Sequence, residues 1–236
     1  LGDGGAGTNR VTLPSGTALF CDPGAVFLVN GMDNQSGTSI FYSAGTESAP
    51  ADLDSDTAAG SQTIALPAGV AATLSVGDLI RFQSDHIWGV SGGTDFFTSE
   101  LRQIEWIDGN DVTLDAPLDW AYTQADNAKY SIITPVENIY IQGAHFEPGP
   151  DATPGTDVSY AIQLNKSLNC ILRDISLHNM IGGVGLSDAY STRIDGLLVD
   201  RLPQQTPPYA GSGYGLLAAG CTTQLVVVPP CVHNTW

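Results

Sequence analysis

Apolar residues recur in short strand-like phrases along the second half of the chain. Four phrases carry an apolar anchor in the same place, and these anchors are 31, 22 and 31 residues apart. The anchors are Ile141, Leu172, Ile194 and Leu225. Repeats of this length with loops of variable size are typical of a solenoid, because each unit buries its apolar side chains against the next. The pattern predicts stacked parallel strands over residues 135–236, and we expect further rungs beyond Trp236.

The middle of the chain has a different pattern. A segment rich in Ser, Ala, Gly and Asp opens it, and strands with alternating polar and apolar residues follow, such as Leu101–Trp106. Turn signals such as Asp108-Gly109-Asn110 separate these strands. We therefore expect a small antiparallel β module over residues 47–134, inserted between N-terminal rungs (1–46) and the later rungs.

The composition supports this all-β class, and the charge disfavours two classes of binding partner. The chain has 27 Gly and 14 Pro among 236 residues, which suits many short strands joined by tight turns. Its formal net charge of −17 disfavours binding to nucleic-acid phosphates and to anionic membranes. No apolar segment approaches the length of a membrane-spanning helix. Because the chain begins at Leu1 rather than Met, we expect it to belong to a longer parent protein.

The four cysteines do not have the spacing of a metal site or of a disulfide framework. They are Cys21, Cys170, Cys221 and Cys231. We interpret them as small buried apolar residues. The pattern predicts no metal and no cofactor.

Several motifs resemble the pectate-lyase-like right-handed parallel β-helix superfamily, and within it the tailspike and tail-fibre proteins of bacteriophages. They are Leu13-Pro-Ser-Gly16 with Asp22-Pro-Gly-Ala-Val26, Val76-Gly-Asp-Leu-Ile80 with Asp111-Val-Thr-Leu-Asp-Ala-Pro-Leu118, and Asn138-Ile-Tyr-Ile-Gln-Gly143 with its repeats. The resemblance implies an all-β right-handed parallel β-helix and a homotrimeric, extracellular virion protein of the phage tail. It further implies contacts with other tail proteins and with host surface polysaccharide, which some members cleave.

The repeat register suggests one candidate catalytic column. The sixth residue after each of the first three anchors is Glu147, His178 or Asp200, and each follows an apolar residue expected to point inward. Stacked on adjacent rungs, these groups could serve as acid and base in polysaccharide cleavage. The alternative is a set of solvated polar residues at a turn.

Other residues carry candidate sugar contacts. Arg173 and Asp195 each follow an anchor, so we expect them to face each other, either as a rung-to-rung ion pair or with Arg173 binding a sugar carboxylate. Trp88 in a Gly-rich segment and Tyr209 and Tyr214 beside a Pro-rich loop could stack on sugar rings. For the Trp residues on strands, core packing is the preferred interpretation.

Three functions follow from the sequence. The leading one is a phage tail spike or fibre component that binds host surface polysaccharide as its receptor. The alternatives are a polysaccharide-degrading lyase or glycosidase on the same scaffold and a bacterial surface adhesin. The sequence leaves open whether the chain is an enzyme.

Overall fold

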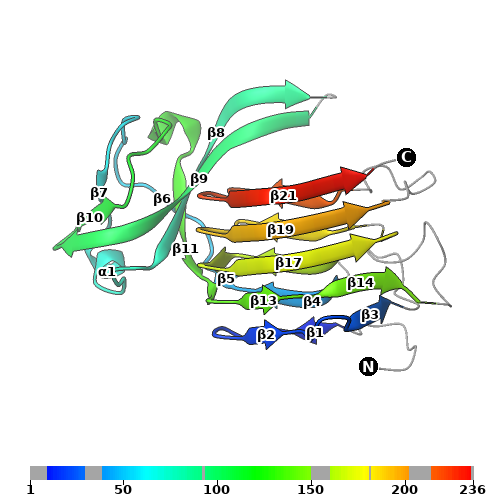
Figure 1. Cartoon of the computed structure of the whole chain (residues 1–236). Helices are drawn as coiled ribbons and strands as arrows, with labels where there is room; N and C mark the ends of the chain where they lie inside the picture. The colour runs from blue at the N-terminus through cyan, green and yellow to red at the C-terminus, as the bar shows by residue number, and fades with distance from the viewer. Residues whose placement is uncertain are drawn as a thin grey trace. The chain divides into compact units, whose positions relative to one another are not determined.

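The structure is a computed structural model that describes residues 10–29, 39–91, 94–149, 160–180, 182–201 and 214–234. The chain divides into two compact units (Figure 1). Unit 1 combines residues 1–44 with residues 136–236, and unit 2 comprises residues 45–135.

Regular structure among the described residues is almost entirely β. The helical segments there are one short α-helix, α1 (Ala68–Ala71), and one 3-10 turn, η1 (Gln124–Asp126). The all-β class predicted from composition is confirmed. No helix of the described residues is long and apolar enough to cross a membrane.

Unit 1 is built from parallel sheets whose strands stack rung upon rung (Figure 1). One sheet has the order β1 (Val11–Thr12), β4 (Ser39–Ala44), β15 (Tyr160–Asn165), β18 (Val184–Ser187) and β20 (Leu216–Ala219). A second, short sheet pairs β12 (Val136–Glu137) with β16 (Ser167–Leu168). Single bridges extend the second stack from Leu168 to Tyr190 and from Tyr190 to Thr223.

The largest parallel sheet of unit 1 contains the sequence repeats. Its lower rungs each consist of two short strands, β2 (Ala18–Phe20) with β3 (Val26–Val29), and β13 (Tyr140–Gln142) with β14 (His145–Pro148). The rungs above are single strands, β17 (Ile171–His178), β19 (Arg193–Asp200) and β21 (Val226–Asn234). Every pairing in this sheet is parallel.

The first three predicted anchors occupy one column, with Ile141 paired to Leu172 and Leu172 to Ile194. The predicted fourth anchor is wrong, because Ile194 pairs with Val227 rather than Leu225. The backbone explains the difference. A residue with positive φ lies three positions before each anchor, and before Val227 this residue is Gln224. The repeated left-handed corner residues are Asn138, Asn169, Ser191 and Gln224.

The core of unit 1 is a stack of aliphatic and aromatic side chains from successive rungs. The anchors Ile141, Leu172 and Ile194 are fully buried. Buried and outward side chains alternate at both ends of β17 and β19. The alternation breaks once in the middle of each strand, at Asp174 and Gly196, where the backbone φ is positive. No single rung could bury its apolar residues alone, which makes the stacking the main source of stability.

Unit 2 is an antiparallel sheet. Its order is β5 (Thr46–Glu47), β11 (Lys129–Thr134), β8 (Leu79–Ser91), β9 (Thr94–Asp108), β10 (Asp111–Leu114) and β7 (Thr63–Ala65), with β6 (Ala51–Asp52) also paired to β11. Its core includes Ile80, Phe82 and Ile104. The long strands β8 and β9 form a hairpin whose outer part continues past the core (Figure 1).

The expectation that tryptophans on strands pack in the core fails for Trp106, which is 64% exposed on β9. The register between β9 and β10 shifts at this point, because Thr113 pairs with Trp106 and the next residue, Leu114, pairs with Ile104. This bulge breaks the alternation after Ile104 and turns Trp106 outward.

Candidate functional site

The register of the largest parallel sheet in unit 1 places the predicted polar column at the ends of its strands. His178 on β17 pairs with Asp200 on β19, and Asp200 pairs with Asn234 on β21. Phe146 pairs with Leu177, so Glu147, the next residue on β14, lies at the level of His178 one rung below. Parallel strands lie about 4.8 Å apart, which brings side chains of adjacent rungs within contact distance.

His178 and Asp200 contact each other directly. The Nδ1 atom of His178 lies 2.8 Å from Oδ2 of Asp200, with side-chain exposures of 39% and 34%. A carboxylate at one ring nitrogen fixes the orientation of the ring. Both side chains of the pair are about one third exposed.

A second imidazole–carboxylate contact lies on the rung below. The Nε2 atom of His145 is 2.8 Å from Oε1 of Glu147, and its Nδ1 contacts the hydroxyl of Ser176 on β17. His145 and Glu147 are two residues apart on β14 and share a face of the strand. Two imidazoles and two carboxylates thus come from three consecutive rungs.

This arrangement contains the groups that acid–base chemistry on a sugar chain needs. A carboxylate or a neutral imidazole can accept a proton, and a protonated imidazole or carboxylic acid can donate one to a leaving oxygen. The same groups also suit binding, because carboxylates accept hydrogen bonds from sugar hydroxyls and imidazoles both donate and accept them.

Arg173 does not form the expected rung-to-rung ion pair with Asp195. The two residues are register partners, but Asp195 binds Arg193, whose Nε lies 2.8 and 2.9 Å from its two carboxylate oxygens. Arg193 is two residues away on the same strand face, and the hydrogen bond and charge of Asp195 raise the pKa of Arg193. The Nε atom of Arg173 lies 3.8 Å from Oδ2 of Asp174, and its side chain is 54% exposed.

The predicted sugar-stacking residues belong to both units. Trp88 on β8 of unit 2 is 59% exposed, and its ring centroid lies 5.7 Å from that of Phe96. Tyr214, which precedes β20 of unit 1, is 45% exposed. Tyr209 lies outside the described residues.

The cysteine expectation is met in part. Cys170 is buried, and burial raises the pKa of its thiol. Cys21 and Cys221 are only partly buried. The side chain of Cys231 lies outside the described part. Within the described ranges, no three His, Cys, Asp or Glu side chains cluster as a metal site would require.

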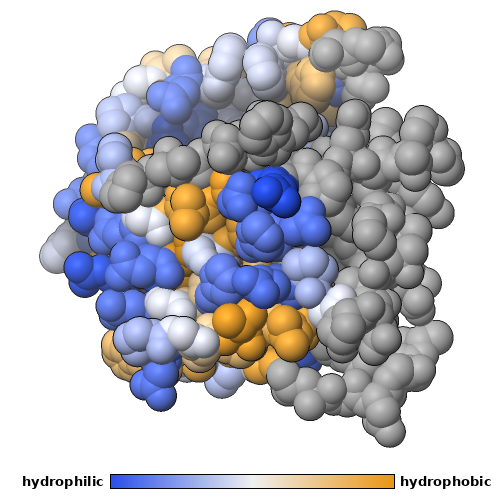
Figure 2. All heavy atoms as spheres, turned by 45° about the vertical axis from the view of Figure 1, so that its right-hand side comes forward, coloured by the Kyte–Doolittle hydropathy of each residue, from blue (hydrophilic) through white to orange (hydrophobic). Residues whose placement is uncertain are grey.

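The surface around the column mixes polar and apolar side chains. Exposed apolar residues on the strands of the same sheet include Leu28 on β3 and Leu198 on β19, at 60% and 46%. Figure 2 shows hydrophilic side chains interspersed with hydrophobic ones on the face it presents, rather than one continuous apolar surface.

Comparison with known proteins gives matches to both units. Residues 49–134 match the family described as K1 capsule-specific polysaccharide lyase, Rider domain. Among solved structures, the tailspike protein gp49 of Pseudomonas phage LKA1 is similar to the chain, with a TM-score of 0.51 and 19% identity over 71% of this chain and 30% of that one. The fold of the chain is similar to that of a phage tailspike protein. The likeness to phage tailspike proteins stated from its motifs is thereby confirmed.

Two further tailspikes match at lower similarity. Gp61 of Pseudomonas phage phi297 has a TM-score of 0.44 and 12% identity, covering 79% of this chain and 41% of that one. Gp54 of Acinetobacter baumannii bacteriophage AP22, solved in complex with A. baumannii capsular saccharide, has a TM-score of 0.44 and 14% identity, covering 91% and 46%. The chain thus spans less than half the length of each of these tailspikes. No curated protein sequence matches it significantly.

Sequence reasoning about this tailspike-like chain missed two residues of the candidate site. His145 contacts Glu147 and Ser176, and its position two residues before Glu147 on a strand was the signal that could have identified it. Arg193 was missed as the partner of Asp195 for a similar reason, since both lie on one face of β19. In both cases the contact lies within a single strand, whereas the register argument compared only equivalent positions of different rungs.

Proposed function

We propose that this chain is part of a phage tailspike that binds host surface polysaccharide as its receptor. The proposal rests mainly on one observation, which is that one chain contains two kinds of unit. A module matching the Rider domain of a capsule-specific polysaccharide lyase is inserted into stacked parallel sheets whose fold is similar to that of a phage tailspike. One comparison leads to a capsule-specific polysaccharide lyase and the other to a phage tailspike, and both descriptions are compatible with contact with a host surface.

The proposal includes the architecture of the complete protein. Unit 1 forms part of a right-handed parallel β-helix that further rungs complete, and the protein is a homotrimer in the virion tail, outside the cell and attached to other tail proteins. Exposed apolar side chains on the parallel strands, such as Phe20 and Leu28, supply area that neighbouring subunits bury. The acidic surface suits a ligand bound through hydroxyl groups rather than through phosphates.

Binding to immobilised polysaccharide tests the receptor function. Purified protein is passed over capsular polysaccharide and lipopolysaccharide from a panel of candidate hosts, and its mass is determined by light scattering. We expect saturable binding to the polysaccharide of one host group and a trimeric mass. Absence of binding to every preparation would overturn the receptor function. A monomeric mass with retained binding would favour the adhesin.

A second candidate function is cleavage of the bound polysaccharide. It is favoured by the His178–Asp200 contact and the His145–Glu147 contact on adjacent rungs, because they bring acid and base groups together at the strand ends. In hydrolysis one carboxyl group protonates the leaving oxygen while a base activates water. In a lyase reaction a base removes the proton beside a sugar carboxylate, a C=C bond forms, and the bond to the glycosidic oxygen breaks as an acid protonates that oxygen. Arg173 is the candidate cation for the carboxylate.

Sizing of the polysaccharide after incubation tests cleavage. We expect shorter chains with the wild-type protein and intact chains with Asp200→Asn or Glu147→Gln. Asp195→Asn is the matched control, because Asp195 is an outward carboxylate on the same strand that binds Arg193 instead of an imidazole. An unsaturated product absorbing in the ultraviolet identifies a lyase, and new reducing ends without it identify a hydrolase. Intact polymer that still binds would leave a receptor without catalysis.

A further inference from the structure

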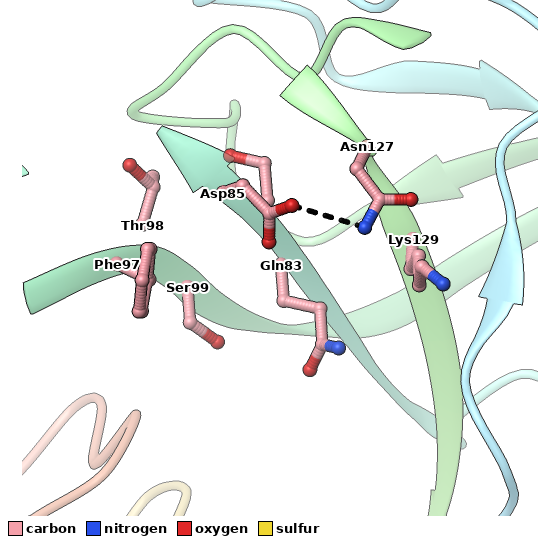
Figure 3. Close-up of a pocket in the computed structure, with 8 residues that line it drawn as sticks. Gln83, Asp85, Phe97, Thr98, Ser99, Asn127 and Lys129 are labelled. Atoms are coloured by element: carbon pink, nitrogen blue, oxygen red, sulfur yellow. Dashed lines mark hydrogen bonds between the residues drawn. The ribbon is translucent and has the colours of Figure 1, made fainter. Parts of the chain in front are cut away.

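Unit 2 has a hollow of about 240 Å³ on its antiparallel sheet (Figure 3). It is lined by side chains from β8, β9, the start of β11 and Asn127, which precedes β11. The residues that matter here are Gln83, Asp85, Phe97, Ser99, Asn127 and Lys129. Ligand pockets for whole drug-sized molecules begin at about 300 Å³, so this hollow suits a single ring.

Strand register explains why these side chains gather on one face. Lys129 on β11 pairs with Gln83 on β8, and Gln83 pairs with Ser99 on β9, which makes one row across three strands. Phe97 lies two positions before Ser99 on β9 and so returns to the same face. On β8 the register shifts between Gln83 and Ile87, and Phe97 pairs with Ile87. Asp85 lies within this irregular stretch and lines the hollow together with Asn127, two residues before Lys129.

The polar groups of Asp85 and Asn127 are held in place. The Nδ2 atom of Asn127 donates a hydrogen bond of 3.1 Å to Oδ2 of Asp85, as Figure 3 shows. Asn127 is itself fixed in a left-handed conformation as the C-cap of η1, where its backbone N–H binds the carbonyl of Gln124. The second carboxylate oxygen of Asp85 is turned toward Gln83 in the same view. A carboxylate, two amides and a lysine side chain therefore line a space small enough for one ring.

Phe97 provides an apolar wall. Its side chain is 54% exposed, although the hydroxyl-bearing residues that follow it, Thr98 and Ser99, are tied to backbone carbonyls of β8. An aromatic ring that stays exposed beside fixed polar groups offers the large apolar face on which the C–H side of a sugar packs.

The charges around the hollow favour a neutral ring. The Nζ atom of Lys129 lies 3.5 Å from Oδ1 of Asp52, and Asp85 supplies a second carboxylate. Two carboxylates near one ammonium group repel an anion, whereas they accept hydrogen bonds from hydroxyl groups.

We propose that this hollow is a second carbohydrate-binding site that holds one neutral, hydroxyl-bearing hexose unit of a glycan. Phe97 packs on the ring, Asp85 and Gln83 bind its hydroxyl groups, and Asn127 and Lys129 donate hydrogen bonds. The inference rests on the proposed polysaccharide-binding function and deepens it, because it gives the Rider-like unit its own contact with the polymer. No bond is made or broken at this site.

The test uses the full chain and defined probes. Methyl glycosides of glucose, galactose and mannose are titrated against the protein, with glucuronate as the acidic probe, and binding is followed by ligand-observed NMR. We expect a neutral hexoside to bind more tightly than glucuronate. Phe97→Ala and Asp85→Asn should each weaken its binding by about tenfold or more. Trp106→Ala is the matched control, because Trp106 is another exposed aromatic residue on β9 that does not line the hollow.

The outcomes separate the inference from the function on which it rests. The inference is overturned if no hexoside binds, if glucuronate binds more tightly, or if Phe97→Ala and Asp85→Asn bind as the wild type does. If those variants also hold host polysaccharide with unchanged affinity, the receptor function stands without this site. If the hexoside binds as expected and no host polysaccharide is held, the site stands and the receptor function fails.

Discussion

Replacing Ile194 with alanine tests which side chains of β19 point into the core, on which the site assignments in unit 1 depend. Ile194 is fully buried on β19, where its register partners are Leu172 below and Val227 above. Leu198 lies on the same strand beyond the break in alternation at Gly196, is 46% exposed and is the matched control. Both changes remove an aliphatic side chain from β19, so they differ mainly in whether that side chain faces the core or the surface.

The size of the effect follows from burial. Removing a fully buried Ile side chain costs the transfer free energy of its carbons and leaves a cavity, about 2–5 kcal/mol in total. The rungs above and below limit collapse into that cavity, because their backbones are held by parallel hydrogen bonds. For a chain of this size, about 1 kcal/mol changes Tm by about 2–4 °C. We expect Ile194→Ala to lower Tm by about 10 °C and Leu198→Ala by only about 2 °C.

The measurement is thermal unfolding followed by circular dichroism, with urea unfolding to obtain the free energy. All proteins are compared at one concentration, because association would add to the stability of each. The reasoning is refuted if Ile194→Ala leaves Tm within about 2 °C of the wild type. It is also refuted if Leu198→Ala costs as much as Ile194→Ala, because the outer face of β19 would then be as buried as the inner one.

Three further changes probe other parts of the chain. Gly183→Ala should destabilise unit 1 by about 2 kcal/mol or more in urea unfolding, because the new Cβ would collide with the carbonyl of Gly215, whereas Gly89→Ala has open space and should change little. Arg102→Ala should cost about 3–5 kcal/mol, since it leaves the buried carboxylate of Glu100 without its partner, and a small loss would contradict this. Burial raises the pKa of Cys170, so the unfolded thiol loses its proton first as pH rises, and stability should fall above about pH 9. Cys170→Ala should flatten that slope in urea titrations, and an unchanged slope would exclude the effect.

The sequence by itself determined the strand class and much of the rung register. The pairing of Ile141, Leu172 and Ile194 could be predicted, because a buried column needs an apolar residue at the same place in every rung. The level shared by Glu147, His178 and Asp200 followed from the same count. These features lie within a few residues of each other in every rung, so they recur in the sequence at equivalent positions.

Tertiary structure decided the contacts that the repeat does not encode. Loops of different length separate the rungs, so counting from Ile194 missed Val227, which the left-handed corner at Gln224 positions. A bulge against β10 turned Trp106 outward, and no periodicity reveals where a partner strand inserts a residue. The hollow around Asp85 exists only because β8, β9 and β11 pair, and Asn127 lies 42 residues from Asp85 in the chain. The period of apolar residues predicts which face of its own strand a side chain occupies, as long as the strand is regular. Strand pairing determines where that regularity breaks and which side chains of other strands a residue contacts.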